Sequence, residues 1–183
     1  DGTQSETITI TENDSAPTVT LSTSASSIAE NSVSTLTLTA TLSNATTADV
    51  TVALGTSGTG TEGTDYGSIS DITISAGATT GTATFDPTDD SVYEGNETAI
   101  VAITGVSGGS ATESGTQSET ITITDGGEVA PLVTLSITSP SSIAENSGSS
   151  LTLTATLSNA TTADVTVTFS TGGGATEGTD YQT

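Results

Sequence analysis

Apolar and polar residues alternate along most of this 183-residue chain. The alternation is clearest from Leu36 to Leu42, where Thr residues separate Leu, Leu, Ala and Leu, and it recurs from Val50 to Leu54. A period of two residues is typical of β-strands that bury one face and expose the other. Strands are therefore predicted at seven places in the central part of the chain: 18–22, 34–42, 48–55, 69–75, 79–86, 97–106 and 117–124.

The segments between the predicted strands are rich in Gly, Ser, Asn and Asp, as turns are. Seven short strands within about 110 residues, without helical periodicity, predict an all-β fold of the immunoglobulin-like seven-stranded β-sandwich type. The Cys and Trp residues of true immunoglobulin domains are absent from this chain.

Several segments of the chain occur twice, about 114 residues apart. The segment from Gly2 to Thr11 returns as Gly115 to Thr124, and Leu36 to Val50 returns as Leu151 to Val165. This period corresponds to one domain of ordinary size. It predicts three tandem parts: the last strand of a preceding module with its linker (1–16), a complete module (17–126), and a linker with the N-terminal half of the next module (127–183).

The charge of the chain is entirely negative, because its 22 Asp and Glu residues are accompanied by no Lys, Arg or His. Nucleic acid is therefore excluded as a partner, since binding it requires basic side chains, and an anionic membrane surface is disfavoured for the same reason. No apolar run approaches the length of a membrane span. A self-repelling acidic chain requires salt or divalent cations to stay compact, which indicates a secreted or cell-surface protein.

The composition also disfavours an enzyme. Without His, Cys, Lys or Arg, the usual pairs of nucleophile and base cannot be built. Paired carboxylates remain, but glycosidases place them across a sugar-binding cleft, and such clefts are normally aromatic. This chain has two Phe, three Tyr and no Trp.

The densest group of carboxylates lies between Asp89 and Glu97, where four of nine residues are acidic. Like charges this close raise one another's pKa, and no basic side chain can neutralise them. Ca2+ would neutralise them, because it takes six to eight oxygen ligands in a flexible geometry. A solvated acidic turn is the alternative interpretation of this segment alone.

Three elements together resemble the Calx-beta domain, the module of sodium–calcium exchangers and of many large bacterial surface proteins. They are the Glu30-Asn31 pair, the Gly63-Thr64-Asp65-Tyr66 element and the loop from Asp89 to Glu97, and their order and spacing match as well. The resemblance covers essentially the whole chain. It implies that Ca2+ binds at one end of the sandwich.

The resemblance also implies the metal ligands. Those of the central module are Glu30, Asp65, Asp89, Asp90, Glu94 and Glu97, the carbonyl of Val92, and Asp125 after the last strand. The counterparts of Asp125 in the preceding module are Glu12 and Asp14, and the third part retains Glu145 and Asp180. The exchanger has a longer run of Asp after its last strand, so this chain is expected to bind fewer ions or to bind them more weakly.

These features predict a calcium-binding structural segment, such as an adhesin stalk or extracellular filament. Its partners would be other copies of the module, in tandem or in a filament, and cell-surface or matrix molecules. One alternative is a calcium-sensing regulatory module. Another is an ice- or surface-binding array of Thr, as in Thr37, Thr39 and Thr41 or in Thr7, Thr9 and Thr11, although Thr is also favoured on any wet strand face.

Overall fold

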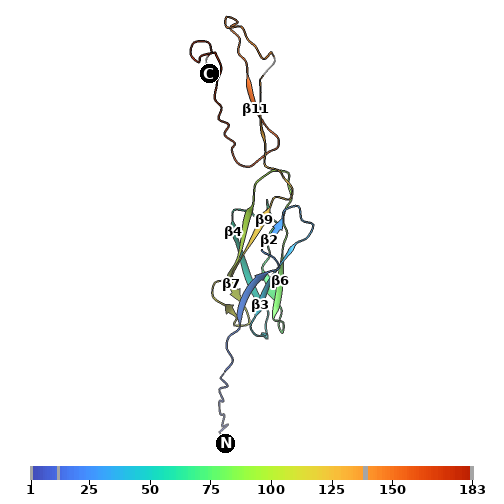
Figure 1. Cartoon of the computed structure of the whole chain (residues 1–183). Helices are drawn as coiled ribbons and strands as arrows, with labels where there is room; N and C mark the ends of the chain where they lie inside the picture. Colours follow the sequence, from blue (N-terminus) through green and yellow to red (C-terminus); the bar gives the residue numbers. More distant parts are fainter. Residues whose placement is uncertain (1, 12, 138–139, 182–183) are drawn as a thin grey trace.

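The computed structural model describes residues 2–11, 13–137 and 140–181. Its central part is a sandwich of two β-sheets, and the two ends of the chain extend from opposite ends of this sandwich (Figure 1). Within the described ranges, no helix is long and apolar enough to cross a lipid bilayer. The predicted all-β, immunoglobulin-like sandwich is confirmed.

The first sheet has the strand order β6-β3-β1-β8 and the second has the order β2-β9-β7-β4-β5. The strands of the sandwich are β1 (Thr18–Thr23), β2 (Ser27–Ala29), β3 (Leu36–Leu42), β4 (Val50–Gly58), β5 (Ile72–Ile74), β6 (Thr80–Phe85), β7 (Glu97–Ser107), β8 (Thr112–Glu113) and β9 (Ser118–Thr124). Each of the seven predicted strands coincides with one of these. The short strands β2 and β8 were not predicted, because two or three residues are too few to show a period.

The core lies between the two sheets and is built from the alternating apolar positions. In β3, for example, Leu36, Leu38, Ala40 and Leu42 are buried. Two aromatic rings close one part of the core, since Tyr66 and Phe85 stack with their centroids 4.9 Å apart. Tyr66 also forms an isolated bridge with Pro87, so the turn before Tyr66 is fixed against the segment that follows β6.

A change of sheet between β1 and β2 positions the first acidic residue. β1 pairs with β3 in the first sheet, whereas β2 pairs in parallel with β9 in the second. Because parallel strands end at the same edge, the residues that follow β2 and β9 lie side by side. The backbone N–H of Glu30, directly after β2, donates to the carbonyl of Thr124 at 3.0 Å.

The parts outside the sandwich carry the repeated sequence but do not complete a second core. The described residues 2–11 are exposed and belong to no strand. β10 (Val133–Ile137) and β11 (Leu153–Leu157) form an antiparallel hairpin with the pairing of β1 and β3. Leu135 in this hairpin is 56% exposed, whereas its counterpart Leu21 in β1 is 6% exposed. The division into three tandem parts stays a prediction.

Candidate metal centre

One end of the sandwich gathers the acidic residues, because three strand ends meet there. β2 and β9 both finish at this end, and β7, which is antiparallel to β9, begins there with Glu97 paired to Ile123. Glu30 follows β2 and Asp125 follows β9. The loop from Asp89 to Glu97 leads into β7 and so approaches the same end.

A first acidic cluster consists of Glu30, Asp89 and Glu128, with one carboxylate oxygen of each within 4.8 Å of the others. The Glu30 residue is only 6% exposed. Its Oε1 and the Oε2 of Glu128 are buried and have no hydrogen-bond partner in the described part of the chain. Burial first, and then the nearby carboxylate of Glu128, raise the pKa of Glu30 from 4.5 to about 7.

A second acidic cluster consists of Asp65, Glu94 and Glu97, again with an oxygen of each within 4.8 Å of the others. Asp65 is 8% exposed. Burial, followed by the negative charges of Asp65 and Glu94, raises the pKa of Glu97 from 4.5 to about 7. Burial and the charge of Asp65 also raise the pKa of Glu94.

The local sequence fixes Asp65 at this position. Its Oδ2 accepts the backbone N–H of Thr61 at 2.5 Å, and its own N–H donates to the Thr61 carbonyl at 2.9 Å. Gly63 has a φ of 87° in this turn, a conformation that favours glycine. The same turn forms at Thr176 to Tyr181, where Asp180 Oδ2 accepts the N–H of Thr176 at 2.7 Å.

Two further carboxylates, Asp125 and Asp90, hold the acidic loop in place by accepting backbone N–H groups. Asp125 accepts the N–H of Glu94 at 3.3 Å and that of Gly95 at 2.9 Å. Asp90 accepts the N–H of Val92 at 2.7 Å. Both charges contribute to the raised pKa values of Glu30 and Glu94. In the described residues, neither belongs to the two clusters.

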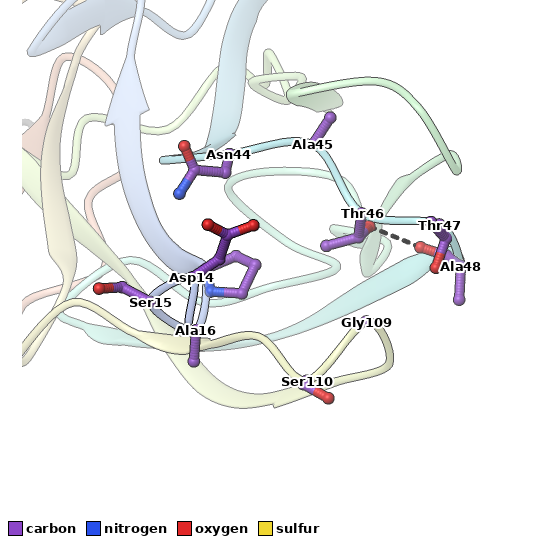
Figure 2. Close-up of a pocket in the computed structure, with 11 residues that line it drawn as sticks. Asp14, Ser15, Ala16, Asn44, Ala45, Thr46, Thr47, Ala48, Gly109 and Ser110 are labelled. Carbon is purple, nitrogen blue, oxygen red and sulfur yellow. Dashed lines mark hydrogen bonds between the residues drawn. The ribbon is translucent and has the colours of Figure 1, made fainter. Parts of the chain in front are cut away.

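The predicted carboxylate ligands of the central module therefore lie at one end of the sandwich, where five of them divide into two clusters. Glu30 and Asp89 belong to the first cluster and Asp65, Glu94 and Glu97 to the second, while the Val92 carbonyl stays a prediction. Among the described residues, the ligands predicted for the preceding module and for the third part are not at this end of the sandwich. Glu12 lies outside the described residues, Asp14 lies at the opposite end of the sandwich beside Asn44 (Figure 2), and Glu145 and Asp180 are exposed in the third part.

Glu128 is the cluster residue that is not among the ligands implied by the Calx-beta resemblance. As an acidic residue of the junction between modules, it was expected either to be a hydrated spacer or to complete a cation site at the end of the sandwich. Its distance from Glu30 depends on the path of Gly126 and Gly127. The side-chain amide of Asn31 donates to the Gly126 carbonyl and so fixes that path. The signal in the sequence is the repeat itself, because Glu128 precedes Pro131 as Asp14 precedes Pro17.

The donor set fits a hard divalent cation. Every side chain of the two clusters offers carboxylate oxygens, which Ca2+ and Mg2+ prefer. The buried, unpartnered oxygen of Glu30 is the strongest indication, because a buried polar atom without a partner is costly unless an ion or hydrogen bond satisfies it. Two separate clusters provide room for two ions.

The fold and the acidic end of the sandwich define an immunoglobulin-like β-sandwich module with two carboxylate clusters that can hold metal ions. The chain belongs to the LapA domain family, whose model matches residues 14–126. The expected family was Calx-beta, and the family that the comparison shows is LapA. No curated protein matches the chain.

Similar solved structures include three from Calx. The apo-form Calx CBD1 domain is 19% identical, with a TM-score of 0.49, and the match covers 59% of this chain and 97% of that one. The CBD12 structure from CALX1.2 is 20% identical, with a TM-score of 0.47 and coverage of 54% and 41%. The calcium binding domain CBD12 of CALX1.1 is 21% identical, with a TM-score of 0.46 and coverage of 54% and 42%.

Proposed function

We propose that this chain is a calcium-binding structural segment of a large secreted or cell-surface protein of the adhesin type. In this role Ca2+ stabilises the module and stiffens the joint to the next part of the chain. Membership of the LapA domain family supports a role in surface adhesion. The partners would be further copies of the module and cell-surface or matrix molecules.

The observation that carries this proposal is the carboxylate of Glu30. It is almost fully buried beside Asp89 and Glu128, with an unpartnered oxygen, in a chain that has no basic side chain to neutralise it. A cation held by these three residues would neutralise the buried carboxylate of Glu30 and offset its repulsion from Glu128. Six carboxylates in two clusters give each ion three side-chain ligands, and backbone carbonyls and water would supply the rest.

The position of Glu128 supports the mechanical part of the proposal. Glu30 and Asp89 belong to the sandwich, whereas Glu128 belongs to the linker, after the pair Gly126-Gly127. A cation shared by the three would connect the sandwich end to the linker. The same ion would neutralise the negative charge at the joint, so the next module would hold a narrower range of angles.

Isothermal calorimetry of the chain with CaCl2, together with its melting temperature, tests the proposal. We expect heat of binding and a higher melting temperature, both reduced by Asp89→Asn, which removes a ligand charge from the first cluster. Glu119→Gln is the matched control, since Glu119 lies on β9 and belongs to neither cluster. The proposal would be contradicted if millimolar Ca2+ produced no heat of binding and no change in melting temperature.

A second candidate function, binding to an ordered surface such as ice, is supported by the alignment of hydroxyl side chains on the first sheet. Thr39 pairs with Ser22 of β1 and Thr82 of β6, and Thr41 pairs with Thr20 and Thr80. All of these are exposed except Thr39, which is half-exposed. Adsorption of the chain to growing ice, and its loss in Thr82→Lys, would support this function. Equal adsorption of both proteins would contradict it.

A further inference from the structure

The end of the sandwich opposite the acidic clusters contains an open hollow of about 940 Å³. Three segments line it: the linker 14–17, the turn 44–48, and the bend at Gly109 and Ser110 (Figure 2). Thr46 is buried in this turn and donates its hydroxyl to the Ala48 carbonyl at 2.6 Å. The proposed calcium-binding function leaves this end unused.

The turn that lines the hollow occurs a second time in the chain. Residues 157–165 repeat residues 42–50 without a single difference. In this second copy the turn touches the acidic loop of the central module. The backbone N–H of Tyr93 donates to the Ala160 carbonyl at 3.3 Å, and Tyr93 forms an isolated bridge with Thr161.

The linker beside the turn is repeated in the same way, with similar hydrogen bonds. The N–H of Thr18 donates to the hydroxyl of Ser43 at 3.0 Å, and that of Leu132 donates to the hydroxyl of Ser158 at 2.9 Å. The linker residues 128–131 correspond to residues 14–17, so Glu128 of the first acidic cluster corresponds to Asp14 beside the hollow. Turn and linker therefore form one structural unit that is present at both joints.

We propose that the hollow at residues 14–17 and 44–48 is the docking site for the acidic loop of another copy of this module, the copy that precedes it in tandem. Tyr93 of the central module already makes the equivalent contact with Ala160 and Thr161, which belong to the second copy of the turn. In the docked state the Ala45 carbonyl accepts the N–H of the residue equivalent to Tyr93. Asp14 then faces the preceding copy's first acidic cluster, as Glu128 faces Glu30 and Asp89.

Disulfide crosslinking tests the contact that the chain already contains. The protein has no cysteine, so Tyr93→Cys with Thr161→Cys introduces the only two thiols. Bridged backbones lie about 5 Å apart, and a disulfide needs Cα atoms about 4.4–6.8 Å apart. We expect an intramolecular disulfide with chelator present, which separates this result from the calcium proposal. Tyr93→Cys with Thr46→Cys is the control, because Thr46 lies in an identical turn at the far end of the module.

The hollow itself is tested in a lengthened chain, in which residues 1–124 are followed by residues 12–183. Tyr93→Cys in the first copy and Thr46→Cys in the second should form an intramolecular disulfide as fast as the pair above. The reversed pair, with Thr46→Cys in the first copy and Tyr93→Cys in the second, uses the same residues at the two outer ends and should not. Ala45→Cys, at an exposed position, replaces Thr46→Cys if the buried substitution lowers the melting temperature. Equal rates for the two arrangements would overturn the proposal.

Discussion

Replacing Glu30 with Gln should stabilise the metal-free protein at neutral pH and weaken its response to calcium. Gln has nearly the size and shape of Glu but no charge, so it removes the buried anion without leaving a cavity. Its amide group can donate a hydrogen bond to Glu128, which is the acidic partner of Glu30 in the folded protein. The substitution is therefore expected to raise stability without the ion and to reduce the stabilisation that the ion provides.

The magnitude follows from the raised pKa of Glu30. Burial and the charge of Glu128 raise it from 4.5 to about 7, and each pKa unit corresponds to about 1.4 kcal/mol. At pH 8 the free energy of unfolding of the metal-free protein is thus lower by on the order of 3 kcal/mol than it would be with a neutral side chain at position 30. For a module of this size, roughly 4 °C per kcal/mol gives a melting temperature about 10 °C higher for Glu30→Gln in chelator.

The pH dependence has a definite sign. Because the folded pKa is above the unfolded one, the favourable contribution of the proton is complete below pH 4.5 and is lost as the pH rises to about 7. The stability difference between Glu30→Gln and the unsubstituted protein should therefore be small at pH 4.5 and reach its maximum above pH 7. Both proteins should be measured in the same chelator, with Glu119→Gln as the control for one lost negative charge.

Calcium should cancel most of this difference. An ion at a hundredfold excess over its dissociation constant stabilises the folded state by about 2.7 kcal/mol, and Gln supplies a weaker ligand than the carboxylate. Thermal unfolding monitored by circular dichroism, with and without CaCl2, measures both effects. A Glu30→Gln protein that melts lower than the unsubstituted one in chelator at pH 8 would refute the reasoning, because the buried charge would then be stabilising.

Four further predictions concern the acidic loop, the counter-ions, the hairpin and the joint. Gly95→Ala should cost about 1 kcal/mol in unfolding experiments because Gly95 has a φ of 79°, while Gly2→Ala, in an open and exposed position, should cost nothing. Removing calcium with a chelator should lower the melting temperature, and NaCl should restore only part of the loss because ionic screening does not replace coordination. Full restoration by NaCl would show that the acidic residues act only by repelling one another. Amide hydrogens of residues 140–181 should exchange faster than those of residues 17–126, and equal protection would contradict the exposure of the hairpin. Small-angle scattering of the lengthened chain should give a narrower distance distribution with calcium than with chelator, and superimposed curves would show that calcium does not affect the joint.

The fold was largely predictable because apolar and polar residues alternate with a period of two along its longer strands. β3 alternates buried and exposed residues along its whole length, and such a strand can be identified without knowing its partners. β2 and β8 were missed since pairing with β9 and β1, rather than their own sequence, makes them strands. The change of sheet before Ser27 is likewise set by tertiary packing.

Five of the six residues in the two clusters were among the predicted ligands, but their division into two clusters was not predictable. Carboxylate density and family spacing identified Glu30, Asp65 and the acidic loop, yet they suggested one continuous ligand set. The separation into two clusters depends on where the loop from Asp89 to Glu97 turns, which the hydrogen bonds to Asp125 determine. The resemblance did not include Glu128 for a similar reason, since the path of the linker brings this residue back onto the sandwich.

The two ends of the module are unlike, and this has a consequence for assembly. The acidic loop and its clusters lie at one end, while the turn 44–48 and the linker lie at the other. A contact between two unlike surfaces leaves a free surface of each kind at the ends of the pair, so it extends into an open chain unless rotation closes a ring. In the proposed tandem array, the short linkers would hold successive modules end to end, which disfavours a ring. A stalk built from such modules would therefore carry its carboxylate clusters at every joint, where a bound cation would resist bending most directly.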